Sequence, residues 1–261
     1  MDSPFIFKIF RPAGQLSPYV QGVWSASVAL RARKNITRWL HSDAGSGILF
    51  NLNAPIYLGD TQFSAGVILL PVKKQAQSIT LSPGAQLVGL RFHPAIGFGV
   101  LGRLDETPIA IEIDDVPFSL HVLCAQLAKI EGHYARIVAL YRWLNGTIDF
   151  SGVAPASLMY TLHAMQSGQT LAQLSEQTQL GQRQLERQFK RWMGMTAKHY
   201  QRIVRVKNSL DFLKHNPDVN LVDLALDHGF TDQAHMTREF KQIARITPGQ
   251  YSKRVACRQT D

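Results

Sequence analysis

A short segment near the C-terminal end places basic and acidic side chains at helical spacing. Arg183, Glu186, Arg187 and Lys190 follow one another at positions i, i+3, i+4 and i+7, so they share one face of a helix. Arginine donates paired hydrogen bonds to guanine O6 and N7, and glutamate accepts one from cytosine N4. On this segment alone the chemistry stays open, because an ordinary solvated helix surface has the same composition.

The helix that would carry this face is amphipathic. Leu185, Phe189 and Trp192 recur at i, i+4 and i+7 away from the basic residues, which predicts a buried stripe on a helix over 182–193. A shorter helix precedes it and ends in a tight turn at 179–181. A short helix, a tight turn and a second helix with an exposed polar face are typical of a helix-turn-helix, whose second helix reaches base edges in the major groove.

The same arrangement occurs again about 50 residues later. A helix over about 232–244 would bury Met236, Phe240 and Ile243 and expose a polar face made of Gln233, Thr237, Arg238 and Lys241. A helix over about 197–214 would bridge the two. A rigid bridge can set two reading helices into successive major grooves, about 34 Å apart along one face of DNA.

Helix-end signals agree with this reading and predict seven short helices over 156–254. Thr170 and Gln173 form a capping box, and Thr247 stands before a proline at the start of the last helix. Gly229 has the position of a left-handed C-cap. The C-terminal part is therefore expected to be all-α.

Residues 156–254 resemble the DNA-binding domain of the AraC/XylS transcriptional regulators. The resemblance rests on the Gly-Phe pair and the Arg-x-Phe-Lys motif within 227–241, and on Thr-Pro-x-x-Tyr within 246–251. In the first helix-turn-helix, the segments 185–190 and 194–196 match the corresponding part of the family. The family's fold is a double helix-turn-helix that binds DNA.

The resemblance implies roles for residues on both reading helices. The base-reading residues would be Arg183, Glu186, Arg187, Gln233, Thr237 and Arg238. The phosphate contacts would be Gln182, Lys190, His235 and Lys241. Ala234 departs from several relatives, which carry a polar side chain there, so it would read nothing or only a thymine methyl. The implied partners are double-stranded promoter DNA and, for an activator, RNA polymerase.

The N-terminal half has a different pattern. Seven short strands separated by turn residues predict a β-sandwich or barrel, at 5–10, 22–29, 36–41, 48–53, 67–70, 77–81 and 87–93. From about residue 116 the period changes to 3.6, which predicts a helix pair at about 117–146. A Gly- and Ser-rich linker follows. The expected fold is therefore α+β with two domains, 1–150 and 151–261.

Parts of this half are similar to the β-rich sensor domain attached to some AraC-type regulators. The similar segments are 17–20 with Trp24 soon after, 48–52 and 88–94. The similarity implies a cupin-like sandwich that binds a small-molecule effector or forms a homodimer through the 117–146 helices. The apolar stripe of these helices fits packing on the sandwich equally well. A domain that binds only other proteins is a further alternative.

The sequence gives candidate residues for an effector pocket but does not identify the effector. The candidate pocket residues are Trp24, Trp39, Phe50, Arg91 and His93. Arg91 and His93 share a strand face, where Arg91 would hold an anionic effector; an Arg–Asp pair and aromatic residues in an ordinary core are the alternatives. No metal site or cofactor is expected, because neither His41 nor His93 belongs to a His-x-His or His-x-x-x-His pair.

Composition supports a nucleic-acid partner and argues against other classes. The net charge is +9, and residues 151–261 hold 15 Lys and Arg against nine Asp and Glu. The two cysteines, Cys124 and Cys257, exclude a disulfide framework and a four-thiolate zinc site, and their contexts do not fit an alkyl-transfer repair protein. The longest apolar run, 66–72, is strand-sized, and no secretory signal is visible. A cytoplasmic protein that is not an enzyme is expected; a cupin-like enzyme fused to a DNA-binding module is the alternative.

Overall fold

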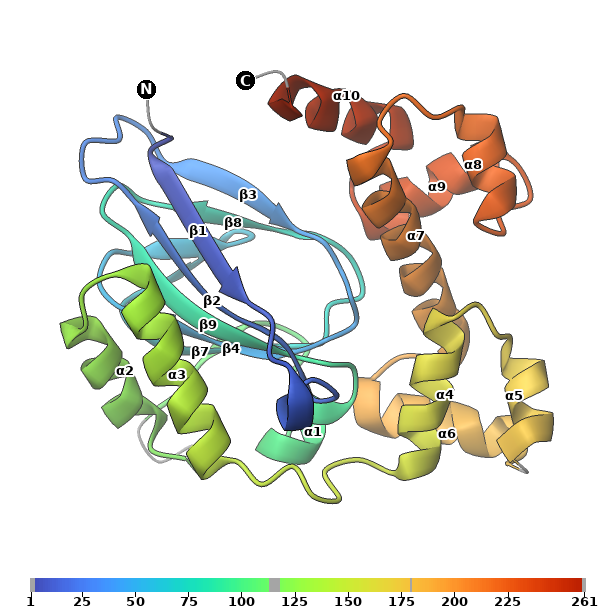
Figure 1. Cartoon of the computed structure of the whole chain (residues 1–261), viewed down its shortest axis with the longest axis horizontal. Helices are drawn as coiled ribbons and strands as arrows, with labels where there is room; N and C mark the ends of the chain where they lie inside the picture. The colour runs from blue at the N-terminus through green and yellow to red at the C-terminus, as the bar shows by residue number, and fades with distance from the viewer. Residues whose placement is uncertain (1–2, 113–117, 179, 260–261) are drawn as a thin grey trace. The chain divides into compact units, whose positions relative to one another are not determined.

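The computed structural model describes residues 3–112, 118–178 and 180–259 (Figure 1). The chain divides into two compact units. The N-terminal unit comprises residues 1–40, 45–72 and 77–156. The C-terminal unit comprises residues 157–261 together with two short segments, 41–44 and 73–76.

The N-terminal unit is a β-sandwich. Its strands are β1 (Phe5–Phe10), β2 (Val20–Val28), β3 (Ile36–Leu40), β4 (Gly47–Asn51), β5 (Ile56–Leu58), β6 (Thr61–Phe63), β7 (Gly66–Leu70), β8 (Gln77–Leu81), β9 (Gln86–Phe92) and β10 (Ile109–Ala110). One sheet has the order β1-β2-β9-β4-β7-β10 and the other the order β3-β8-β5-β6. Neighbouring strands pair antiparallel throughout both sheets.

The core between the sheets follows from strand alternation. Leu49, Ile68 and Leu87 project from the six-stranded sheet, and Ile79 and Leu81 project from the four-stranded sheet to meet them. All five side chains are buried. Because successive side chains alternate between faces, the residues next to them in the six-stranded sheet point to its other face.

Two helices cover that other face (Figure 1). They are α2 (Leu120–Lys129) and α3 (His133–Thr147), and the apolar stripe of each helix is buried. The predicted pair over 117–146 is thus confirmed where the chain is described, while residue 117 lies outside the described residues. The stripe is used in packing on the sandwich, which was one of the two readings of the sequence.

A polar contact fixes the start of α3 to the sheet. The imidazole of His133 bridges the hydroxyl groups of Ser25 and Ser27 on β2, at 2.9 Å from Nδ1 and 3.1 Å from Nε2. The Ser25 hydroxyl donates to the carbonyl of Leu87, which leaves its oxygen to accept from Nδ1–H. Burial lowers the pKa of His133, which favours the neutral imidazole, and in that form Nε2 accepts from the Ser27 hydroxyl.

The sequence did not predict five short elements. These are β5, β6, β10, the 3-10 helix η1 (Gly14–Leu16) and the helix α1 (Ile96–Leu101), which are between two and six residues long. Strands this short carry too few residues to show alternation, and α1 contains two glycines, which are poor helix formers. Pairing with the distant strands β8 and β7 defines β5 and β10, whereas β6 pairs with the neighbouring β5.

The C-terminal unit is all-α in its described residues. Its seven helices are α4 (Ala156–Gln166), α5 (Leu171–Thr178), α6 (Gln182–Met193), α7 (Ala197–His215), α8 (Leu221–Asp227), α9 (Gln233–Ile243) and α10 (Pro248–Gln259). They match the seven predicted helices. Among the described residues no helix is both long and apolar enough to cross a membrane.

The predicted helix ends are also present. The N–H of Thr170 donates to Gln173 Oε1 at 2.8 Å, as a capping box requires. Gly229 has φ +72°, and the Phe230 N–H reaches back to the Ala225 carbonyl at 2.8 Å, which is a Schellman motif. The first contact defines the start of α5, and the second defines the turn between α8 and α9.

Candidate nucleic-acid interface

The first helix-turn-helix consists of α5 and α6. Leu185, Phe189 and Met193 are the buried residues of α6, while Trp192, predicted inside, is only half-buried. The opposite face exposes basic and polar side chains, namely Gln182, Arg183, Arg187 and Lys190. The structure therefore brings these four predicted contact residues together on one accessible face.

The Glu186 side chain makes a hydrogen bond within the C-terminal unit. Its Oε2 accepts the backbone N–H of Ala197, the first residue of α7, at 3.1 Å. The first N–H groups of a helix have no partner within the helix, so this acceptor adds to the N-cap of α7, where the Thr196 hydroxyl accepts the His199 N–H at 3.1 Å. A carboxylate at a helix N-terminus is also favoured by the helix dipole. Glu186 therefore fixes the bridging helix to the reading helix.

The second helix-turn-helix consists of α8 and α9. Asp232 caps α9 by accepting the N–H of His235 at 2.6 Å. Met236, Phe240 and Ile243 are buried as predicted, and Gln233, Arg238 and Lys241 are exposed on the other side. Three of the predicted contact residues of α9 thus share one accessible face.

The other two predicted contact residues of α9 make internal contacts. The Thr237 hydroxyl donates to the Gln233 carbonyl at 2.9 Å, one turn back along the helix. His235 Nδ1 accepts the N–H of Thr231 at 3.2 Å, and its ring meets Phe230 edge-on with centroids 5.7 Å apart. His235 therefore helps to hold the turn, which limits its freedom to reach a phosphate.

The bridging helix α7 holds the second helix-turn-helix through two arginines. Arg202 Nε lies 2.9 Å from the carboxylate of Glu239 on α9, which is only 10% exposed. Arg205 donates to the carbonyl of Gly229 at 2.7 Å, and its guanidinium lies 5.2 Å from the centre of the Phe230 ring. One helix thus contacts both the turn and the reading helix of this pair, so it fixes their orientation.

The two helix-turn-helix pairs are a sequence repeat with a spacing of 51 positions. The matched positions are Arg187 and Arg238, Phe189 and Phe240, Lys190 and Lys241, Thr196 and Thr247, and Tyr200 and Tyr251. In this alignment Glu186 matches Thr237, and Ala197 matches Pro248. Proline has no N–H, so no donor exists there for a glutamate to cap. A glutamate at position 237 would therefore have no backbone N–H to accept at position 248, whereas Glu186 accepts that of Ala197.

Both matched arginines lie on the exposed face of their helix. Among the described residues Arg187 and Arg238 make neither a hydrogen bond nor an ion pair, and both are exposed. Arg183 is exposed in the same way. An unpaired guanidinium with five donors on an accessible helix face is available for the paired hydrogen bonds that guanine offers.

The five predicted effector residues are not brought together. Trp24 packs against the core between the sheets, and its ring lies over Gly89, where a Cβ atom would come within 2.4 Å of it. Phe50 is fully buried beside Leu49, so it points to the opposite face of the same sheet. Trp39 is 45% exposed. Arg91 and His93 are half-buried and alternate with Phe92, so they do share a face.

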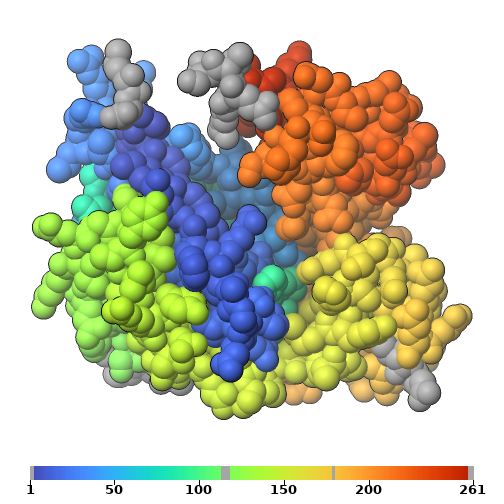
Figure 2. Space-filling model, viewed as in Figure 1, coloured from blue at the N-terminus to red at the C-terminus, as the bar shows by residue number. Residues whose placement is uncertain are grey.

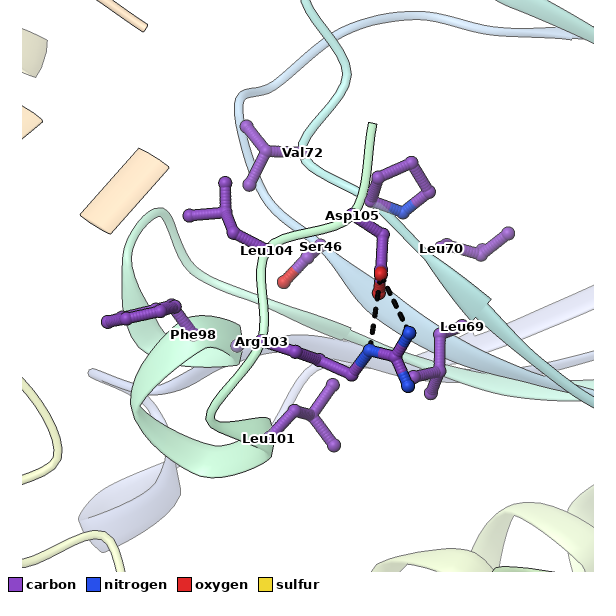
Figure 3. Close-up of a pocket in the computed structure, with 11 residues that line it drawn as sticks. Ser46, Leu69, Leu70, Val72, Phe98, Leu101, Arg103, Leu104 and Asp105 are labelled. Atoms are coloured by element: carbon purple, nitrogen blue, oxygen red, sulfur yellow. Dashed lines mark hydrogen bonds and ion pairs between the residues drawn. The ribbon is translucent and has the colours of Figure 1, made fainter. Parts of the chain in front are cut away.

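A small pocket lies elsewhere in the N-terminal unit (Figure 3). It lies between β7, α1 and the segment after α1, where Arg103 and Asp105 form an ion pair of 2.9 Å. Its free volume of about 20 Å³ holds roughly one water molecule. None of the five predicted effector residues lines it. In this form the pocket does not accommodate an organic effector.

The residues that orient the second reading helix were missed in the sequence. Arg202, Arg205 and Glu239 look like ordinary surface charges on helices. One signal was present, because Glu239 lies next to Phe240 and three residues after Met236, on the border of the buried stripe. A charge on that border must find a partner within the domain.

Comparison with known proteins agrees with this geometry. Residues 174–254 match the protein family described as "Helix-turn-helix domain". The chain is 24% identical over 175 residues to the HTH-type transcriptional activator RhaR of Salmonella dublin, covering 65% of this chain and 60% of that protein. It is 33% identical over 70 residues to the HTH-type transcriptional regulator MtrA of Neisseria gonorrhoeae, covering 27% of this chain and 23% of MtrA.

The fold is similar to that of a solved structure over nearly the whole chain. The 1.65 Å structure of ToxT from Vibrio cholerae aligns with 96% of this chain and 98% of its own, with a TM-score of 0.50 and 12% identity. That likeness concerns the fold, and it spans both the β-rich and the helical part. Residues 174–254 thus form a helix-turn-helix domain, and its repeated arrangement behind a β-rich N-terminal domain resembles that of the AraC-type regulators.

Proposed function

We propose that this chain binds specific promoter DNA by placing α6 and α9 in two successive major grooves. The observation that carries the proposal is the matched pair Arg187 and Arg238, exposed and unpaired at equivalent places of the repeat. The basic C-terminal half, with 15 basic against nine acidic residues, favours approach to the phosphate backbone.

The proposed roles differ between the residues on the two helices. Arg183, Arg187, Gln233 and Arg238 would read bases, and Thr237 would contact a base through its methyl group, since its hydroxyl is engaged within the helix. Gln182, Lys190 and Lys241 would contact phosphates, and His235 would do so only weakly. Glu186 is proposed as a positioning residue that caps α7, rather than as a reader of cytosine.

The test is a single substitution on the second reading helix. Arg238→Ala should cost about 1–3 kcal/mol in binding to the chosen site and relax the preference at one base position. Selection of binding sites from random DNA would reveal that position. Arg254→Ala, which removes an equally exposed cation from α10, is the matched control and should leave the preference unchanged. A loss from Arg238→Ala that is equal on all sequences would instead make it a phosphate contact.

The N-terminal sandwich is proposed to sense a small molecule and to mediate pairing of two chains through the α2–α3 region. The sandwich fold and its similarity to sensor domains support this. A ligand that binds only the folded state raises stability by RT ln(1+[L]/Kd), which is about 2.7 kcal/mol at 100 times Kd. Thermal unfolding with a panel of metabolites tests it, and no stabilising compound would favour a domain that binds only proteins.

We infer further that the chain acts in the cytoplasm without catalysing a reaction, and that it contacts RNA polymerase if it activates transcription. The relatives that support this are described as a transcriptional activator and a transcriptional regulator. The matched part covers 60% of RhaR, so these properties of the whole protein are proposals.

A further inference from the structure

The first strand of the six-stranded sheet is an exposed edge. β1 pairs with β2 on one side, and the described residues place no strand on its other side. Four of its six side chains are large, apolar and 44–50% exposed, namely Ile6, Phe7, Ile9 and Phe10. Figure 2 shows this segment, in dark blue, at the surface. Such an edge is a ready template for another strand.

Hydrogen bonding shows which residues of β1 offer that edge. The Ala29 N–H donates to the Pro4 carbonyl at 2.8 Å, which makes this a hydrogen-bonded pair of the β1–β2 ladder. Hydrogen-bonded pairs alternate, so Ile6, Lys8 and Phe10 use their backbone groups toward β2. The alternate residues, Phe5, Phe7 and Ile9, direct N–H and C=O away from it. The Phe5 N–H accordingly meets the Ser3 hydroxyl at 3.3 Å, not β2.

We propose that β1 pairs antiparallel with β1 of a second copy of this chain, so that the two six-stranded sheets join across a two-fold axis. This deepens the pairing of two chains proposed above and rests on it, but it does not depend on DNA binding. The occupant is a second copy because the strand is complementary to itself, as its hydrogen-bonding groups and its charge both indicate.

The hydrogen-bonding groups select one register. A two-fold axis perpendicular to the sheet pairs outward-directed residues with outward-directed residues. Only the register centred on Phe7 engages all three, with Phe7 opposite Phe7 of the partner subunit and Phe5 opposite Ile9 of the partner subunit. Three hydrogen-bonded pairs exchange two bonds each, which gives about six bonds between the chains. Each of the two registers shifted by one pair leaves one outward-directed residue, Phe5 or Ile9, without a partner within the strand.

Charge disfavours one of the two shifted registers. Lys8 is the one charged residue of β1. In the register that leaves Phe5 without a partner, Lys8 lies directly opposite Lys8 of the partner subunit, and like charges in that position are destabilising. In the register centred on Phe7 it lies opposite Ile6 of the partner subunit instead, where its aliphatic stem can cover the isoleucine while the ammonium stays in water.

Helix α3 adds apolar surface beside the same edge. Lys8 Nζ lies 5.8 Å from the centre of the Tyr134 ring, and the rings of Phe10 and Tyr141 meet edge-on at 5.3 Å. Tyr134 is 69% exposed and Val138 is 44% exposed. Because the two-fold axis preserves the faces of the sheet, α3 of each chain would flank the seam on the same side.

The experiment begins with sedimentation of the full chain over a range of concentrations, followed by single-cysteine variants at positions 5 to 9. Cys124 and Cys257 are first replaced by serine. Residues that form a hydrogen-bonded pair lie about 5.5 Å apart at Cα, within the range of a disulfide. Phe7→Cys should therefore cross-link to itself on mild oxidation. Phe5→Cys and Lys8→Cys should not, because their equivalents in the partner are displaced along the strand.

A charge pair tests the register without oxidation. Ile6→Glu places a carboxylate opposite Lys8 of the partner subunit twice, so it should lower the dimer dissociation constant severalfold; Ile6→Lys should raise it by a similar factor. A monomer at all concentrations would overturn both the pairing and the edge. A dimer that cross-links best at position 8, or at no position of β1, would show that two chains pair but would overturn the proposed pairing of β1 with β1 centred on Phe7. DNA binding, measured in parallel, would report separately on the reading helices.

Discussion

At the scale of single residues, the surface of each reading helix divides into free and engaged side chains. Arg187 and Arg238 have no partner among the described residues, whereas Glu186 accepts the first N–H of α7 at 3.1 Å. The sequence identified all three as readers, because spacing places a side chain on a face but does not reveal a backbone donor from the next helix. Burial and capping partners come from tertiary structure.

The role of Glu186 gives the first prediction at this scale. Glu186→Ala removes the acceptor of the Ala197 N–H but leaves the Thr196 N-cap of α7, and it should lower the free energy of unfolding by about 1 kcal/mol or less. Glu186→Gln keeps an acceptor oxygen and should lose less. Chemical denaturation measures both, and site selection on random DNA should show an unchanged base preference. If Glu186→Gln retained its stability but changed the preferred base, Glu186 would be a reader after all.

His133 gives the second residue-scale prediction. Burial lowers its pKa, with Arg136 and Lys8 adding to the effect, so the folded protein favours the neutral imidazole. The unfolded state then binds more protons below the ordinary value of about 6.5, so this contribution is present above that pH and is lost as the pH falls below it. Thermal unfolding from pH 8 to pH 5.5 should show a smaller decline for His133→Gln than for wild type. Equal slopes would contradict the assignment.

At the scale of elements, periodicity predicted those that are long and regular. The bounds of β1, β8 and α6 were predicted to the residue, since each has a full apolar pattern or clear end signals. The short strands β5, β6 and β10 were not, because they have too few residues to show alternation, and pairing with the distant strands β8 and β7 defines β5 and β10. The effector site was predicted from aromatic residues on strands, but Trp24 and Phe50 lie on opposite faces of one sheet. The pairing register of β2 and β4 with β9, which determines the face on which each side chain lies, could not be predicted from the sequence.

The contact between α7 and α9 is the element-scale prediction. Arg202→Ala leaves the buried Glu239 carboxylate without its partner and should cost about 2–4 kcal/mol of stability. It should also weaken specific DNA binding, since α9 loses its orientation. The double variant Arg202→Met with Glu239→Leu removes both charges and should recover most of the stability. Denaturation midpoints of the three proteins check this, and additive losses in the double variant would refute the coupling.

At the scale of the whole molecule, the repeat matters more than either helix-turn-helix alone. Matched residues 51 positions apart present the same chemistry twice, and α7 contacts the second pair directly through Arg202 and Arg205. Figure 1 shows α7 running between the two pairs. Two weakly specific helices held by one rigid element lose little freedom on binding together, so the pair is expected to be far more selective than either helix.

The measurement that tests this account most directly is fluorescence anisotropy on the chain's own upstream DNA and on scrambled DNA at several salt concentrations. The account predicts that wild type prefers its own DNA by about 10³-fold or more, and that the Arg187→Ala, Arg238→Ala double variant loses this preference while keeping salt-sensitive binding. A double variant that still discriminates between the two DNAs, or a wild type that binds neither even at low salt, would contradict it.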